Sequence, residues 1–264
     1  GLISYIRTDS KRISEEAREK AKGYIIESIG ENYYKDHAKD SKGKKEKKVQ
    51  DAHEAIRPTS VDRTPDSIKD SLSKEQYKLY NLIWRRFVAS QMEDSVFDVL
   101  NVECKIEDLI FKATGSKLKF DGYTKIYNFT EREDKILPSL DEGEILKIQE
   151  YNPQQHFTSP PPRYTEASLV KTLEELGIGR PSTYAPTITT ILNREYVEKD
   201  GASLVPTELG IIVTKILDEN FQKFMEVDFT ADMESQLDQI EEGNAEWKKV
   251  VEEFYSPLAE AIRV

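Results

Sequence analysis

The nine residues LISYIRTDS, Leu2 to Ser10, place a tyrosine, an arginine and an aspartate at every second position. On a β-strand this spacing points Tyr5, Arg7 and Asp9 to one face. A phenol, with an ordinary pKa of about 10, attacks phosphorus only when a neighbouring group assists it, and a guanidinium on the same face can do so by binding phosphate oxygens. Taken alone, the stretch is explained more simply by a strand with a half-buried packing tyrosine.

Length and composition limit the class of protein. The 264 residues suffice for one large domain or two to three small ones, and a charged fraction of 33% with a mean hydropathy of −0.63 is typical of a soluble chain. No apolar run approaches the roughly 18 residues of a membrane helix. The single cysteine, Cys104, excludes an internal disulfide and a cysteine-based zinc site. We expect a cytoplasmic protein without a membrane partner, and, because Gly1 opens directly into an apolar stretch, a fragment.

The charge is unevenly distributed along the chain. The net charge is −11, yet residues 1–57 hold 14 Lys and Arg against 11 Asp and Glu. A polyanion such as nucleic acid should therefore be contacted locally, near the N-terminal segment and in a lined groove.

Two helices are predicted in the first ninety residues. One begins at Ser14 and ends at Gly30, and the other spans Ser73 to Met92, where Ser73 and Gln76 form a capping-box pattern. Between them, Lys39 to Lys48 contains six lysines and two acids. Such a run is usually a solvated loop, and a loop that faces phosphate is the less common alternative.

The segment DAHEAIRP, Asp51 to Pro58, places His53 and Arg57 four residues apart. In a helical turn ended by Pro58, both side chains would project from one face and could hold a phosphate oxyanion. A surface pair of this kind is more often incidental when it is considered alone.

Residues from about 95 to 152 carry β-strand patterns. Apolar and polar residues alternate over 100–107, and the theme repeats in LIFKAT, LKFDGY and EILKIQEY between the turn signals DG and DEG. We expect an antiparallel β module that serves as scaffold.

Beyond the proline run Pro160 to Pro162 the pattern becomes helical. A helix capped by Thr165 and ended by Gly177, a GIGRPS turn, a helix capped by Ser182 and a hairpin at Asp200 and Gly201 follow in the order of a winged helix. A helical subdomain for protein contacts fits the pattern equally well. Three further helices are expected over 207–219, 230–242 and 245–262, with buried stripes that include Met233, Leu237 and Ile240 in one and Trp247, Val251, Phe254 and Leu258 in another.

Four segments together resemble the type IA DNA topoisomerases, and the third most resembles the bacterial topoisomerase I group. They are YIRTDS at Tyr5, AHEAIRP at Ala52, PRYTEASLVKTLEELGIGRPSTYAPTI at Pro162 and FTADMESQLDQI at Phe229. The resemblance implies an α+β multidomain fold. It comprises a mainly helical nucleophile-bearing domain over 1–92, an antiparallel β arch segment over 93–157, and a helical, groove-forming domain with a winged-helix-like portion over 158–264.

The resemblance also implies roles for individual residues. Tyr5 would attack a phosphodiester of single-stranded DNA and retain the 5′-phosphate as a phosphotyrosine link, while Arg7 and His53 act on the scissile phosphate. Asp9 would orient His53 or Arg7. The remaining implied DNA-binding residues are Arg57, Arg163, Thr165, Ser168, Lys171, Arg180, Ser182 and Tyr184.

Family members carry a Toprim domain with a catalytic glutamate and an acidic cluster that binds Mg²⁺, and nothing in this sequence resembles it. The resemblance therefore implies that Mg²⁺ belongs to the full-length enzyme and that none binds this fragment. The expected partners are single-stranded or negatively supercoiled DNA and the Toprim domain. The full enzyme would relax negative supercoils without ATP, and the 264-residue chain alone would bind single strands weakly and relax nothing.

Two other classes of protein remain open. A non-catalytic winged-helix DNA-binding protein accounts for residues 163–206 but leaves YIRTDS and AHEAIRP unexplained. A purely structural helical protein would have no salt-dependent affinity for oligonucleotides.

Overall fold

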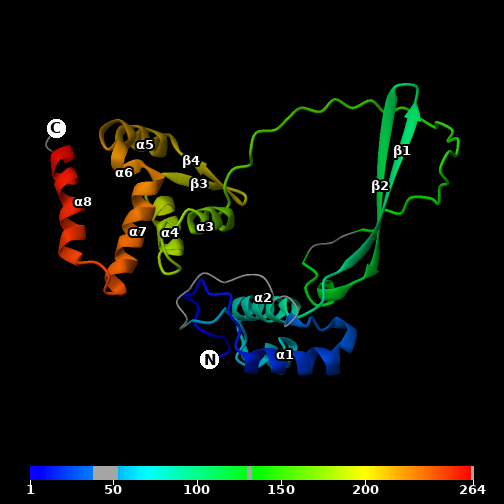
Figure 1. The fold of residues 1–264 in the computed structure, drawn as a ribbon, viewed down its shortest axis with the longest axis horizontal. Helices are drawn as coiled ribbons and strands as arrows, with labels where there is room; N and C mark the ends of the chain where they lie inside the picture. Colours follow the sequence, from blue (N-terminus) through cyan, green and yellow to red (C-terminus); the bar gives the residue numbers. More distant parts are fainter. Residues whose placement is uncertain (38–52, 130–132, 263–264) are drawn as a thin grey trace. The chain divides into compact units, whose positions relative to one another are not determined.

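The computed structural model describes residues 1–37, 53–129 and 133–262. The chain divides into two compact units, Gly1–Pro153 and Gln154–Val264. Helices alternate with two separate, two-stranded antiparallel sheets, one in each unit (Figure 1). The predicted α+β class is confirmed, whereas the separation of residues 1–92 from 93–157 stays a prediction. Within the described ranges, no helix is long and apolar enough to cross a membrane.

Two helices form the base of the first unit. Helix α1 spans Glu15–Ser28 and helix α2 spans Lys74–Ser90, and short 3-10 helices η1 (Glu31–Tyr33) and η3 (Asp66–Ser71) connect them to their neighbours. The capping box predicted at the start of α2 is confirmed, because the Ser73 hydroxyl accepts from the Gln76 N–H and the Gln76 side chain accepts from the Ser73 N–H.

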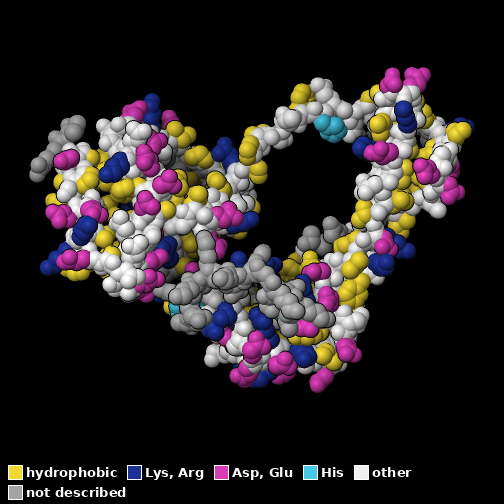
Figure 2. Space-filling model, viewed as in Figure 1, with side chains coloured by type: hydrophobic (Ala, Val, Ile, Leu, Met, Phe, Trp, Pro, Cys, Tyr) yellow, Lys and Arg dark blue, Asp and Glu magenta, His cyan; other side chains and the backbone are white. Residues whose placement is uncertain are grey.

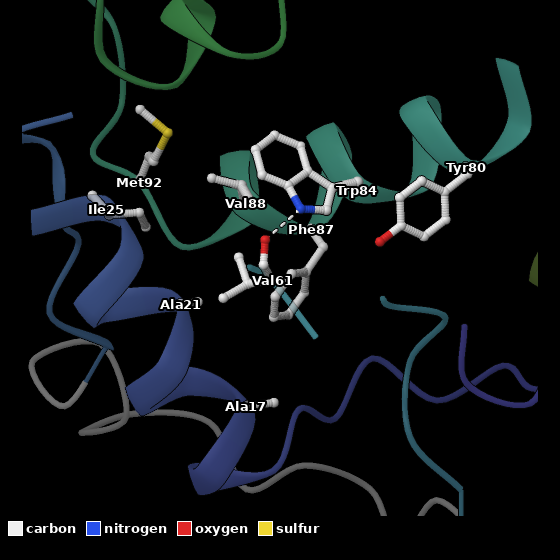
Figure 3. Close-up of a cluster of buried hydrophobic side chains, with 9 residues drawn as sticks. All are labelled: Ala17, Ala21, Ile25, Val61, Tyr80, Trp84, Phe87, Val88 and Met92. Atoms are coloured by element: carbon white, nitrogen blue, oxygen red, sulfur yellow. Dashed lines mark hydrogen bonds between the residues drawn. The ribbon is translucent and has the colours of Figure 1, made fainter. Parts of the chain in front are cut away.

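The core of this unit lies between α1 and α2 (Figure 3). Small residues of α1 leave room for the large side chains of α2, and these side chains fill the space between the two helices. The Trp84 side chain is only 4% exposed, and its indole N–H donates to the Val61 carbonyl at 2.8 Å. The buried residues are Ala17, Ala21, Ile25, Val61, Tyr80, Trp84, Phe87, Val88 and Met92.

A long hairpin follows α2. Strand β1 (Val96–Ile106) pairs with strand β2 (Leu109–Phe120), and Glu107, with φ of 52°, forms the turn between them. The alternation predicted over 100–107 is present, but both faces of the hairpin are largely solvent-exposed, and Figure 2 shows hydrophobic side chains along it among charged ones. The segment LIFKAT and the first three residues of LKFDGY belong to one strand, β2.

The strand predicted over 144–151 is wrong. These residues have no regular secondary structure, and Ile145 is 95% exposed. An alternating segment becomes a strand only when its N–H and C=O groups find a neighbouring strand, and within the described residues this segment finds none.

Close backbone contacts fix the base of the hairpin. The 3-10 helix η4 (Gly122–Lys125) follows β2, and the Tyr123 N–H donates to the Glu93 carbonyl at 2.9 Å. Gly122 has φ of +50°, and a Cβ at this position would overlap the backbone of Glu93 and Asp94. The Tyr33 hydroxyl also donates to Asp121 at 2.7 Å. The hairpin is thereby attached to the helical base.

The second unit begins with the predicted order of helix, turn, helix and hairpin. Helix α3 spans Glu166–Glu175, α4 spans Tyr184–Asn193, and β3 (Val197–Asp200) pairs with β4 (Ser203–Pro206). The cap predicted at Thr165 is confirmed. The cap predicted at Ser182 is wrong, because that residue lies in the preceding turn and Thr183 occupies the N-cap position. The assignment of a winged helix stays a prediction.

Four further helices complete this unit within the described residues: α5 (Glu208–Asn220), α6 (Gln222–Met225), α7 (Val227–Glu241) and α8 (Trp247–Ile262). Gly210 of α5 packs against the Tyr196 carbonyl so closely that any Cβ would overlap it. Phe224, Phe229 and Phe254 join α6, α7 and α8 through ring contacts of 5.0–6.1 Å.

The stripe predicted for α8 is partly wrong. Trp247 and Val251 are 58% and 52% exposed, while Val250 is buried and Phe254 and Leu258 are half-buried. The contacts to Phe224 and Phe229 determine which side of α8 faces inward. In α7, Leu237 of the predicted stripe is likewise exposed, and Met233 and Ile240 are half-buried.

Candidate active site

The N-terminal segment is held by the segment that ends in Pro58. The Ser4 N–H donates to the Arg57 carbonyl at 2.9 Å, and the Thr59 N–H donates to the Leu2 carbonyl at 3.0 Å. These two bonds flank an antiparallel bridge between Ile3 and Pro58. The contact brings residues about fifty positions apart in sequence into register.

The Ser4 hydroxyl strengthens this pairing. It donates to the Ala55 carbonyl at 2.8 Å and accepts from the Arg57 N–H at 2.9 Å. Through these two bonds, Ser4, the residue before Tyr5, holds the backbone of the segment that follows His53. Ser4 is a site component that the sequence reasoning missed, although a hydroxyl residue directly before the tyrosine was a visible signal.

Tyr5 and His53 are neighbours in the folded protein. Their ring centres are 5.7 Å apart with an interplanar angle of 32°. Tyr5 is 58% exposed, so its side chain is accessible to a polymer at the surface rather than sealed in the core. An accessible phenol beside an imidazole can contact one phosphodiester from two sides.

Two predicted local structures around these residues are wrong. Residues 5–9 do not form a strand, because the backbone bends at Ile6 and Arg7 and the pairing ends before them. The Thr8 hydroxyl accepts from the Ser10 N–H at 3.0 Å, a local bond that competes with an extended strand. Residues 53–57 are not a helical turn: the backbone bends at Ile56, and the Arg57 carbonyl at the end of the segment accepts from the Ser4 N–H.

Arg7 and Asp9 lie on the exposed side of this bend. Within the described residues neither has a hydrogen bond or an ion pair, so the predicted orientation of His53 or Arg7 by Asp9 is not present here. The guanidinium of Arg7 therefore keeps all five of its N–H donors for another acceptor.

Arg57 is engaged inside the protein. Its Nε and Nη2 atoms donate to Glu54 Oε2 at 2.9 and 2.6 Å, and Nη1 donates to the Pro58 carbonyl at 3.1 Å. The Arg57 side chain is 18% exposed. It therefore stabilises the loop, and its predicted contact with DNA stays a prediction.

Glu54 links this loop to the start of α1. Burial alone would raise the pKa of Glu54, but hydrogen bonds from the Ser14 hydroxyl and from Arg57 outweigh it and lower that pKa below 4.5. The Ser14 hydroxyl thus donates to Glu54, and it makes no capping bond to α1. Glu54 lay in the AHEAIRP segment but was not singled out from the sequence.

The lowered pKa makes a prediction for stability. A carboxylate whose folded pKa is lowered stabilises the protein above its unfolded pKa, and this contribution is lost as the pH falls through the folded value. We expect Glu54→Gln to lower the free energy of unfolding by roughly 1 kcal/mol at pH 7, with a difference that shrinks below pH 4.5. Urea unfolding at several pH values measures it.

The matched control is Glu27→Gln on α1, because Glu27 is exposed and has no ion pair within the described residues. A Glu54→Gln effect that does not change with pH would contradict the assigned role of the carboxylate.

The candidate DNA-binding residues of the second unit differ in their exposure and in the bonds that they already make within the protein. Arg163 and Ser182 are exposed, and Lys171 is exposed at 3.8 Å from Glu175. The hydroxyls of Thr165 and Ser168 cap α3 by bonding each other's backbone N–H groups. Tyr184 is half-buried at the start of α4.

Arg180 is bound to acids of α7. Its guanidinium donates to Asp238 at 2.6 Å and to the Gly179 carbonyl at 2.7 Å, and it lies 3.7 Å from Glu234. Burial would lower the pKa of Arg180, but Asp238 and Glu234 outweigh it and raise that pKa above its ordinary value. Its predicted contact with DNA therefore competes with two internal carboxylates.

No group of three or more His, Cys, Asp or Glu side chains that could hold a metal ion occurs within the described residues. The Mg²⁺ that the resemblance implies does not fit the residues described in this chain, and we assign no step to it.

Two similarities to known proteins indicate the family of this chain. A family model described as DNA topoisomerase matches residues 1–252. The chain belongs to the DNA topoisomerase family. Its similarity to the bacterial type IA members is specific: the structure of full-length topoisomerase I from Thermotoga maritima is 41% identical in sequence and has a TM-score of 0.82.

That match covers 98% of this chain and 42% of the Thermotoga maritima chain. This topoisomerase chain thus spans less than half of the length of that relative. Within it, Tyr5, His53 and the Ser4 contacts form one surface, whereas the candidate residues from 163 to 184 belong to the other unit.

Proposed function

We propose that Tyr5 is the nucleophile with which this topoisomerase cleaves one strand of DNA. The single observation that carries the proposal is the exposed Tyr5 ring lying 5.7 Å from the His53 ring, held there by the Ser4 hydroxyl. Membership of the DNA topoisomerase family and the similarity to topoisomerase I from Thermotoga maritima support this proposal.

The proposed step exchanges one phosphodiester for another. The Tyr5 oxygen bonds to phosphorus and its proton leaves, the bond from phosphorus to the 3′ oxygen breaks, and that oxygen takes up a proton. The reverse step reseals the strand after another strand has passed. Because the bond energy is conserved in the phosphotyrosine, relaxation of negative supercoils needs no ATP.

The other residues have supporting roles in this proposal. Arg7, which is exposed and unpaired within the described residues, would stabilise the charge that develops on the phosphate oxygens, and His53 would bond the same group. Arg57 and Glu54 hold the loop that carries His53. Single-stranded or negatively supercoiled DNA is the proposed substrate, and we place Mg²⁺ and the Toprim partner in a complete enzyme.

The direction of the covalent link tests the proposal. We suggest a chimera in which residues 1–264 replace the equivalent part of the Thermotoga maritima enzyme, which is 41% identical over this region. With a 5′-phosphotyrosine link, an oligonucleotide labelled at its 3′ end stays attached to the chimera in denaturant, and one labelled at its 5′ end is released. Retention of the 5′ label instead would contradict the proposed step.

A further inference from the structure

A cavity of about 750 Å³ lies in the first unit, away from Tyr5 and His53. Its walls come from the second half of α2, from both strands of the hairpin, from η4 and from the segment after η4. The lining combines aromatic, amide and cationic groups, among them Arg86, Tyr123, Tyr127 and Asn128. The volume lies in the range of pockets that bind small organic groups.

Two adjacent arginines of α2 lie near this cavity and differ in how many of their N–H donors already bond within the protein. Arg85 has an internal role, because it donates to Asn81 at 2.9 Å, to the Ile126 carbonyl at 2.9 Å and to Asn128 at 3.0 Å. Arg86 is exposed, and its one hydrogen bond to another described residue is a long one, at 3.4 Å, to the Tyr127 hydroxyl. Arg85 thus positions the segment 126–129, and Arg86 retains most of its donors.

Aromatic rings accompany both guanidinium groups. Arg86 lies 5.4 Å from the ring centre of Tyr127, and Arg85 lies 5.9 Å from that of Phe129. The two rings meet edge to face at 4.9 Å, and Phe129 is 54% exposed. The Phe129 ring is therefore held in place while one part of it remains open to solvent.

The charge at this site is unbalanced. Within the described residues, neither Arg85 nor Arg86 has a carboxylate within 4.0 Å. Asp134 is the one acid among the lining residues, and it accepts from the Leu118 N–H at 3.0 Å. An uncompensated guanidinium beside open aromatic surface suits a ligand that joins a flat ring to an anion.

We propose that this site binds an unpaired nucleic-acid strand. A base stacks on Phe129 or enters the cavity beside Tyr127, and Arg86 binds the neighbouring phosphate. Every base has a π face, so such a site holds single strands with little sequence preference, and it excludes a duplex, whose bases are already stacked. The proposal relies on the proposed function only in taking the strand to be DNA.

The test uses the 264-residue chain and oligothymidylate that contains 5-iododeoxyuridine. Ultraviolet light should cross-link the base to Tyr127 or Phe129, as identified by mass spectrometry of the digested adduct. Phe129→Leu, which keeps an apolar side chain but removes the ring, should lower the cross-link yield at this site about five- to tenfold, the loss of one stacked base. Arg86→Ala should lower it similarly, with partial rescue by Arg86→Lys.

Matched controls come from the same chain. Arg63→Ala removes another exposed arginine of the first unit, and Phe157→Ala removes an aromatic ring that is 80% exposed in the second unit. Neither should change the yield at Tyr127 and Phe129. Thermal unfolding of each variant checks that the fold is retained, as expected for substitutions at exposed side chains.

Two outcomes would overturn the proposal: no cross-link in this segment, or cross-links here that Phe129→Leu and Arg86→Ala leave unchanged. The result is independent of the cleavage chemistry. Cross-linking at Phe129 in the 264-residue chain, together with no covalent Tyr5 adduct in the chimera, would contradict the proposed function alone. A Tyr5 adduct in the chimera without cross-linking at Phe129 would contradict this site alone.

Discussion

Tyr5→Phe is expected to abolish the covalent DNA adduct in the chimera, with a loss of activity on the order of 10⁴-fold or more, as for the removal of other enzyme nucleophiles. The substitution deletes one oxygen and keeps the ring that packs at 5.7 Å from His53. Because Tyr5 is 58% exposed, the change leaves no cavity. Affinity for single-stranded DNA, measured by fluorescence anisotropy, should stay within about twofold of the parent.

The control for this experiment is Tyr151→Phe, which removes the hydroxyl of another tyrosine in the first unit, one that is 66% exposed. It should form the adduct at the parental rate. An adduct that survives Tyr5→Phe would identify a different nucleophile, and equal losses of cleavage and strand binding would favour a role for Tyr5 in binding alone.

Trp84→Ala should have the largest effect on stability, a loss of about 3–5 kcal/mol. The indole is 4% exposed and contacts Tyr24 edge to face at 5.4 Å. The substitution leaves a cavity between α1 and α2 and also leaves the Val61 carbonyl without its 2.8 Å bond. Differential scanning calorimetry should show the transition of the first unit at a markedly lower temperature.

Trp247→Ala is the matched control, because this second tryptophan is 58% exposed at the start of α8. It should change the free energy of unfolding by less than about 0.5 kcal/mol. Similar effects of the two substitutions would show that the buried cluster around Trp84 contributes little.

Local sequence signals predicted the elements that depend on local bonds. The capping box at Ser73 and the cap at Thr165 were correctly predicted, since each pairs a side chain with an N–H three residues away. The β3–β4 hairpin was correctly predicted from Asp200 and Gly201, where Gly201 has φ of +58°. Such features depend only on residues that lie a few positions apart in the sequence.

Features that depend on distant partners were not predictable in this way. The segment 53–57 bonds to Ser4 through the Ala55 and Arg57 carbonyls instead of forming a helical turn, and this distant partner cannot be read from the segment's own residues. The inward face of α8 depends on the rings of Phe224 and Phe229. The strand predicted over 144–151 had the alternation but found no partner within the described residues.

The candidate site residues were selected on a different basis. Tyr5 and His53 were selected through a resemblance over four segments, and their proximity in the fold agrees with that choice. The bonds from Ser4 to the Ala55 carbonyl and from Ser14 to Glu54 join segments that are distant in the sequence, so these partners could not be predicted from neighbouring residues.

Each unit contains one tryptophan, and the two have opposite surroundings: Trp84 is buried with its N–H bonded, and Trp247 faces solvent. Indole fluorescence shifts to longer wavelengths when water surrounds the ring, so Trp84 should emit in the blue part of the band and Trp247 in the red part. Quenching by iodide should remove the Trp247 emission first. The protein therefore carries one built-in optical reporter for each unit, and no extrinsic dye is needed to follow their unfolding separately.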